Sequence, residues 1–418
     1  MEGLIQLVAE ALAALLLPVL ISLVGLVAEA LSLLWTVASG LIEWRQVRTP
    51  PAAAPTPSPG RKKRWGLRLA LGVAGLLLTV WILTEFVFFP SILNSATKHL
   101  SEKSGIEVSY ASASGWLSTG RVTFKGAAVR RSAAGQDAFD LRLEELTIDA
   151  RPWSLLKGDV SLERVRVIGI RGRYERLAGV ERKPRKPFTA DVLEVVDARV
   201  DWILHREGKP DFTLPLGVER FQVRPFDSVN AAFSVLFRGD GAGSIADAPW
   251  VVSGQGTGEG RHTTWTAKRV PVQLLAGFLG EPFDWFESGS VDVDVRDSWR
   301  RGEKTDVDLR WKLLFHDLRV AVPERIEGIK RRFGSAMSAL ANKHPRELPL
   351  EFTMTIGEQG LMGRMSPEGL ELWDALAAGL IDEFAARSGL PPDSVRELGR
   401  AVWGKLKGWL ENRARGKR

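Results

Sequence analysis

Histidines, cysteines and paired carboxylates do most of the metal binding and proton transfer in proteins, and this sequence has few of them at useful spacings. It contains no cysteine, which excludes disulfides, thiolate metal sites and cysteine nucleophiles. The five histidines are scattered, and no two have the spacing of ligands on one helix or strand: His99, His205, His262, His316 and His344. The sequence therefore predicts no metal site and no cofactor.

Two short motifs resemble signatures of catalysis or phosphate binding. Ser95 to Lys98 matches the S-x-x-K nucleophile pattern, but its companion S-D-N and K-T-G elements are absent. The run SGQGTGEG from Ser253 to Gly260 lacks the terminal Lys-Ser/Thr of a phosphate loop, and no helical pattern follows it. We interpret the first as part of a surface helix and the second as a glycine-rich hairpin.

Four aspartates at alternating positions are the remaining candidates for chemistry, because clustered carboxylates bind calcium. They lie on either side of a Gly-Glu-Lys turn among alternating apolar residues, so solvated carboxylates on an outer sheet face are the preferred interpretation: Asp292, Asp294, Asp306 and Asp308. Neither a G-x-S-x-G motif, a Walker sequence nor a dinucleotide fingerprint occurs. The sequence predicts no catalytic residues and a protein that is not an enzyme.

The positive charge of the chain is concentrated in one loop. The 418 residues have a formal net charge of +7, and residues 43–68 contain seven cations against the single carboxylate of Glu43. Without a basic face on the rest of the chain, phosphate-backbone contacts are not expected. Nucleic acid is therefore not an expected partner.

Two hydrophobic runs frame this basic loop. The first is residues 1–42, apolar from Leu4 to Ile42 except for Glu10 and Glu29, and the second is residues 67–90. Their lengths predict two N-terminal transmembrane helices, joined by a cytoplasmic Pro/Ala-rich loop over residues 43–66. The topology-determining cations of that loop are Arg61, Lys62, Lys63 and Arg64. The first run could instead be a re-entrant or interfacial helix pair broken at Pro18.

One hydrophobic pattern recurs in residues 91–322, where alternation with a period of two predicts strands. This pattern, the offset phrase, reads apolar, any, apolar, any, any, apolar, any, apolar. Its copies are Val122, Phe124, Ala127, Val129; Leu141, Leu143, Leu146, Ile148; Val160, Leu162, Val165, Val167; Leu193, Val195, Ala198, Val200; Leu216, Val218, Phe221, Val223; and Leu313, Phe315, Leu318, Val320.

The offset phrase predicts bulged strands. Two apolar pairs separated by three positions would face opposite sides of a regular strand, whereas one extra residue returns both pairs to one face and bends the strand. We therefore expect a curved, antiparallel sheet with bulges near residues 144–145, 163–164 and 219–220. The predicted fold class is a membrane-anchored α+β protein: N-terminal transmembrane helices, then a curved antiparallel β-sheet with one apolar face, then C-terminal amphipathic helices.

The C-terminal region, residues 323–418, has helical periodicity interrupted by a short strand pair near residues 350–356. Three amphipathic helices are expected, along 326–340, 373–384 and 395–409. The third carries the basic tail and could lie on an anionic membrane surface or pack over an open end of the sheet.

Several segments carry a resemblance to a known family. These are the stretch FPSILNSATKHLSEKSGIEVSYASASGWLSTGRVTFKGAAV, the stretch LRLEELTIDARPWSLLKGDVSLERVRVIGIRGRY, and the distal KRVPVQLLAGFLGEPFDWFESGSVDVDV. Together they resemble the AsmA-like envelope proteins. The resemblance implies an inner-membrane anchor in a double-membraned bacterium, a periplasmic body, and a bent β-groove related in architecture to bridge-like lipid-transfer proteins.

The predicted membrane helices, the single apolar face of the predicted sheet and the resemblance to AsmA-like proteins point to one function. We expect a protein that shelters lipid acyl chains and contributes to lipid transport or envelope biogenesis. The expected partners are membrane phospholipids or other acyl lipids, with envelope proteins as further candidates. The alternative is a non-transporting envelope scaffold that acts through protein contacts. The groove-lining candidates are Val122, Phe124, Leu141, Leu143, Leu146, Ile148, Val160, Leu162, Val165, Val167, Leu216, Val218, Phe221 and Val223.

Overall fold

The fold is described from a computed structural model of the 418-residue chain. The residues that it describes are 72, 75, 105–116, 120–132, 137–151, 161–177, 188–205, 211–255, 260–279, 282–300, 307–356 and 371–389.

Strands dominate this part of the chain, and helices follow mainly toward its C-terminal end. In chain order the elements are β1 (Glu107–Ser109), β2 (Ser112–Trp116), β3 (Arg121–Arg131), β4 (Ala138–Ala150), β5 (Ser161–Ile168), β6 (Arg171–Leu177), β7 (Thr189–His205), β8 (Phe212–Val223), β9 (Phe226–Asp227), α5 (Ala231–Arg238), β10 (Gly239–Ile245), β11 (Ala248–Gln255), β12 (Gly260–Pro271), α6 (Val272–Leu279), the 3₁₀-helix η2 (Phe283–Trp285), β13 (Phe286–Arg300), β14 (Val307–Val320), α7 (Gly328–Lys343), β15 (Glu347–Ile356) and α9 (Glu371–Ser388).

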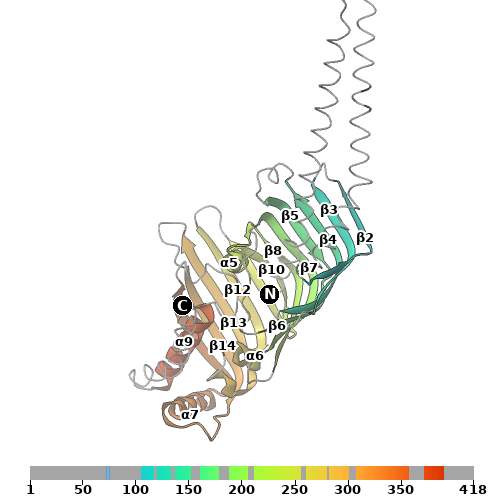
Figure 1. Cartoon of the computed structure of the whole chain (residues 1–418). Helices are drawn as coiled ribbons and strands as arrows, with labels where there is room; N and C mark the ends of the chain where they lie inside the picture. Colours follow the sequence, from blue (N-terminus) through green and yellow to red (C-terminus); the bar gives the residue numbers. More distant parts are fainter. Residues whose placement is uncertain are drawn as a thin grey trace, which may run out of the picture.

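All fifteen strands of the described residues belong to one sheet. Figure 1 shows the sheet curving from β2 and β3 toward β13 and β14, and β15 pairs with β14 at this second end. The main path is β1-β3-β4-β5-β7-β8-β10-β11-β12-β13-β14-β15. The short strands β5 and β6 follow each other between β4 and β7, with β5 beside one half of both long strands and β6 beside the other. A strand pair was expected near residues 350–356; the described residues form one strand there, β15, which pairs with β14 and so extends this same sheet.

The expectation of an antiparallel sheet is corrected, because the sheet is mixed. β5 and β6 both pair with β7 in parallel, with Val165 opposite Leu193 and Arg171 opposite Arg199. The other pairings are antiparallel. Alternation of apolar and polar residues is the same whichever way a strand runs, so the sequence pattern carries no information on strand direction.

Four helices of the described residues pack against the sheet. α5 contacts β8, β9, β10 and β12, whereas α6 contacts β12 and β13. α7 packs on β14 and on α9, and α9 packs on β15. Figure 1 shows α7 and α9 beside β13 and β14, at the end of the sheet away from β2 and β3.

Two of the expected C-terminal helices form. α7 buries Phe333, Met337 and Leu340 of the stripe along 326–340, and α9 buries Leu376, Leu380 and Phe384 of the stripe along 373–384. The third expected helix, along 395–409, lies outside the described residues.

The membrane-anchored fold class is not supported by the structure. None of the helices in the described ranges is long and apolar enough to cross a membrane. The two hydrophobic runs lie outside those ranges, apart from Gly72 and Gly75, which are helical. The predicted transmembrane helices, inner-membrane location and periplasmic body are therefore corrected: what the structure establishes is a β-rich fold built around one large mixed sheet.

Candidate functional site: the apolar sheet face

Copies of the offset phrase lie side by side and in register. Across β3, β4, β5, β7 and β8, paired residues place Val122, Ile148, Val165, Leu193 and Val223 in one row. The next row is Phe124, Leu146, Val167, Val195 and Phe221. Five copies that are distant in sequence therefore build one apolar surface, which we call the phrase face.

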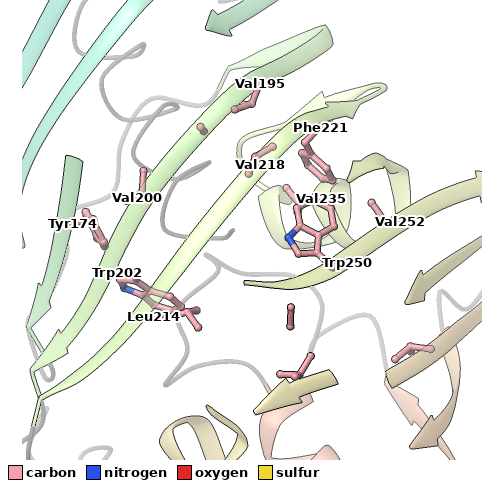
Figure 2. Packing of buried hydrophobic residues seen from close by; sticks show 14 of the residues in the cluster. Tyr174, Val195, Val200, Trp202, Leu214, Val218, Phe221, Val235, Trp250 and Val252 are labelled. Carbon is pink, nitrogen blue, oxygen red and sulfur yellow. The ribbon is translucent and has the colours of Figure 1, made fainter. Parts of the chain in front are cut away.

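The phrase face is buried. Every candidate groove residue in the described ranges has a relative exposure between 0% and 8%, as do Leu193, Val195, Ala198 and Val200 of β7. Figure 2 shows Val195 and Val200 of β7 and Val218 and Phe221 of β8 among the buried cluster. The prediction that both pairs of each phrase share one face is confirmed for these strands.

Two of the three predicted bulges occur. Where β4 pairs with β5, the partners change from Arg164 to Leu162 between consecutive residues of β4, so Glu163 is the extra residue. Where β8 pairs with β10, Arg220 and Val218 lie opposite the neighbours Ala242 and Gly243, so Glu219 is extra. Each extra residue restores the buried side of its strand and bends it.

The third expected bulge, near residues 144–145, takes a different form. Lys125 pairs with Glu145 and Ala127 with Leu143, which leaves Gly126 and Glu144 facing each other without an extra residue. Because β3 and β4 both contain the offset phrase, each contributes one irregular residue, and the register is unchanged. Gly126 has a φ of +59°, a left-handed conformation that glycine adopts readily.

The covering of the phrase face changes along the sheet. In the described ranges, the helices make their main contacts with β8, β9 and the strands from β10 onward. Near α5, Phe221 lies 6.1 Å from Trp250 between ring centroids, as Figure 2 illustrates. The described helices therefore pack mainly on other strands than β3, β4, β5 and β7, which form this part of the phrase face.

Leu313, Phe315 and Leu318 of the phrase copy on β14 are buried, and helix α9 packs against this copy at Phe315. Phe315 of this copy lies 5.9 Å from Phe384 of α9 between ring centroids. Phe286 of β13 lies 6.2 Å from the same ring. Protein side chains thus fill the space above this copy.

Of the three aspartates of this group within the described residues, Asp292 has the most partners. Its carboxylate accepts a 2.8 Å hydrogen bond from the backbone N–H of Arg269 and a 3.3 Å bond from Lys268 Nζ. His316 Nε2 lies 3.4 Å away. Burial raises the pKa of Asp292, but the hydrogen bonds from Arg269 and Lys268, together with the nearby His316, outweigh it, so the pKa is lowered. This carboxylate fixes a bulge of β12, where the register shifts between Ala267 and Val270.

The other described aspartates of this group have separate partners. Asp294 accepts a 3.1 Å bond from Arg296 Nε, and Asp308 accepts a 2.6 Å bond from the Thr355 hydroxyl. Asp306 lies outside the described residues, as do Ser95, Lys98, Val160, and the loop cations Arg61, Lys62, Lys63 and Arg64.

His205 stands at the end of β7 between two carboxylates. Its Nδ1 lies 3.0 Å from Asp211 and its Nε2 lies 3.4 Å from Glu175. Hydrogen bonding to Asp211, with a further contribution from Glu175, raises the pKa of His205 above its usual value against the effect of burial. The pair with Asp211 ties β7 to the start of β8.

Sequence reasoning missed a row of arginines on the opposite face of the sheet. Arg142 of β4 lies opposite Arg171 of β6, which lies opposite Arg199 of β7. Like charges at adjacent cross-strand positions repel by about 1 kcal/mol at a separation near 4 Å in water. The sequence did contain a clue to this row. Arg142 and Arg199 each lie between two apolar positions of an offset phrase. When two phrases pair in register, the residues between their apolar positions are aligned as well.

No protein-family model matches this chain, and no curated protein has a significantly similar sequence.

Proposed function

We propose that this protein shelters lipid acyl chains against the phrase face, in the part formed by β3, β4, β5 and β7. The observation that carries the proposal is the in-register apolar surface built from five copies of one phrase. The resemblance of the sequence to AsmA-like proteins also favours it. Transport of the sheltered lipid between membranes is the activity that such a surface would serve.

The energetics favour an acyl chain as ligand. The surface is long, apolar and without a polar group inside its two central rows, as a methylene chain requires. Each buried methylene contributes about 0.8 kcal/mol, so a chain of many methylenes could offset the cost of uncovering this face.

The experiment compares two double variants of the full-length protein. Leu143→Asp with Val165→Asp places two carboxylates on the phrase face, where both native residues are buried. Lys125→Gln with Arg164→Gln is the matched control, because it changes the net charge equally at exposed positions of the other face. Lipids extracted from each purified protein are quantified by mass spectrometry, and folding is checked by circular dichroism.

The proposal predicts that the wild type and the control retain acyl lipid and that the folded Asp variant loses it. A folded Asp variant that retains its lipid would contradict the proposed site. If the Asp variant does not fold, Val165→Trp fills the same position without a charge and is expected to reduce the bound lipid.

A scaffold that binds other proteins is the second candidate, and one observation favours it. The groove candidates have exposures of at most 8%, which is typical of a protein core that is already covered. In that case the phrase face only stabilises the fold. A wild-type protein that never carries acyl lipid would support this alternative.

A further inference from the structure

The outward face of the sheet contains a hollow of about 500 Å³ between β4, β6 and β7. Seven residues line it: Asp140, Arg142, Arg171, Gly172, Arg173, Arg199 and Asp201. Four of these are arginines and two are aspartates, so the lining is net positive. The hollow lies on the side of the sheet opposite the phrase face, because Arg142 alternates with the buried Leu141 and Leu143.

Two neighbouring cross-strand rows in this hollow have different charge patterns. One row reads Arg130, Asp140, Arg173 and Asp201 across β3, β4, β6 and β7, so that opposite charges alternate. The adjacent row reads Arg142, Arg171 and Arg199, with no carboxylate in it. We call the second the arginine row.

Only one member of the arginine row is neutralised within the described residues. Arg171 donates to the carboxylate of Asp197 and to the carbonyl oxygen of Ile170 at 2.9 Å. Arg142 and Arg199 are exposed and have no ion pair or hydrogen bond from their side chains to any described residue. Two uncompensated guanidinium groups therefore flank a third across three adjacent strands.

One position at the hollow requires glycine, between Arg171 and Arg173 of β6. Gly172 has a φ of +142°, a conformation that L residues rarely adopt. A Cβ built on Gly172 would lie 2.0 Å from the carbonyl oxygen of Asp140. The close approach of the β4 backbone therefore restricts this position to a residue without a side chain.

We propose that the arginine row, Arg142, Arg171 and Arg199, binds a phosphate-type oxyanion. Adjacent strands lie about 4.8 Å apart, so neighbouring guanidinium groups can reach one phosphate together. Planar guanidinium groups donate paired hydrogen bonds to such oxygens, and a bound dianion removes the repulsion within the row. The carboxylate of Asp201 also lines the hollow and, unlike that of Asp140, has no ion pair with a described residue there. Its negative charge would repel a second anion next to the bound phosphate. This site does not depend on the proposed acyl-chain function.

Titration of the full-length protein with inorganic phosphate at constant ionic strength tests the proposal by calorimetry. The wild type is expected to bind saturably. Arg142→Gln with Arg199→Gln is expected to weaken binding at least tenfold. Arg164→Gln with Arg319→Gln removes the same charge from exposed positions outside the row and is expected to change the affinity by less than twofold.

Thermal unfolding supplies a second readout that does not require the calorimetric signal. Phosphate is expected to raise the midpoint of the wild type and of the Arg164/Arg319 variant, but not that of the Arg142/Arg199 variant. Without phosphate, the Arg142/Arg199 variant is expected to unfold at a higher temperature than the wild type, because the repulsion is removed.

The source of the phosphate group is distinguished by vesicles of phosphatidylglycerol and of phosphatidylcholine beside free glycerol phosphate. Arginine-dependent binding of free glycerol phosphate indicates a soluble ligand. Arginine-dependent binding to phosphatidylglycerol vesicles alone indicates a lipid headgroup. Absence of saturable binding to every probe, or equal loss in both double variants, would overturn the site.

Discussion

The two ends of the sheet bury the same kind of apolar face in different ways. Around β13, β14 and β15, helices α6, α7 and α9 supply the cover, with Phe384 of α9 in contact with the rings of Phe286 and Phe315. Around β3, β4, β5 and β7, copies of the offset phrase align in register, and the described helices make their main contacts elsewhere. An apolar strand pattern thus determines which face is buried, while a separate segment determines what covers it.

The largest expected effect concerns the helix-covered end. Phe384→Ala removes a fully buried ring, so we expect the free energy of unfolding to fall by about 3–5 kcal/mol. Phe233→Ala in α5, where the native ring is half-buried, is the control and should cost less. Denaturant unfolding measures both. In the Phe384→Ala protein, the backbone amides of α9 and β15 should lose protection from hydrogen exchange first. An equal loss of protection in β3 and β4 would contradict the distinction between the two ends.

A smaller effect is expected at the bulge of β12. Asp292→Asn removes charge-assisted hydrogen bonds, so unfolding free energy should fall by about 1.5–3 kcal/mol at neutral pH. Because folding lowers the pKa of Asp292, its stabilisation is present above the unfolded pKa and is lost as pH falls through the folded value. Unfolding curves from pH 7 downward should therefore converge for the two proteins. A difference independent of pH would contradict the role of this charge.

At the other end of the sheet, formed by β3, β4, β5 and β7, Gly126→Ala tests the irregular residue of β3. Its φ of +59° disfavours any residue with a Cβ, so we expect a loss of about 1–2 kcal/mol in the free energy of unfolding. Gly75→Ala, at a helical glycine with open space around it, is the comparison and should not destabilise. Thermal unfolding distinguishes the two, and an unchanged Gly126→Ala protein would show that this conformation is not required.

The smallest effect is expected for His205→Gln, because this side chain is one-third exposed. Folding raises its pKa, so its stabilisation is fully present below the unfolded pKa, near 6.5, and disappears as pH rises through the folded value. We expect a loss below about 1 kcal/mol at pH 5 and none at pH 9. Denaturant unfolding at these two values checks the sign, and a larger loss at pH 9 would reverse it.

The buried face was readable in the sequence because side-chain alternation is local. The offset phrase at Leu141 predicted both buried pairs of β4, and the bulges at Glu163 and Glu219 followed from the same rule. The form of the irregularity at Glu144 was not predictable, since it depends on Gly126 of the neighbouring strand.

Strand direction and pairing order were not readable, because they depend on contacts distant in sequence. The alternation of apolar and polar residues along β5 and β6 does not show that these strands pair with β7 in parallel. The arginine row was hidden for the same reason: Arg142 and Arg199 become neighbours only once β6 lies between their strands. The expected membrane anchor rested on hydrophobic length, on the basic loop and on the family resemblance, and no helix of the described residues is long and apolar enough to cross a membrane.

The most direct test of the acyl-chain proposal is photocrosslinking of the full-length protein with a fatty acid that carries a diazirine in its chain. We expect labelled peptides from β3, β4, β5 and β7, competition by unlabelled fatty acid, and little labelling of β13 and β14, where Phe384 of α9 packs on the sheet. Labelling that is absent, that resists competition, or that is confined to the helix-covered end would contradict it.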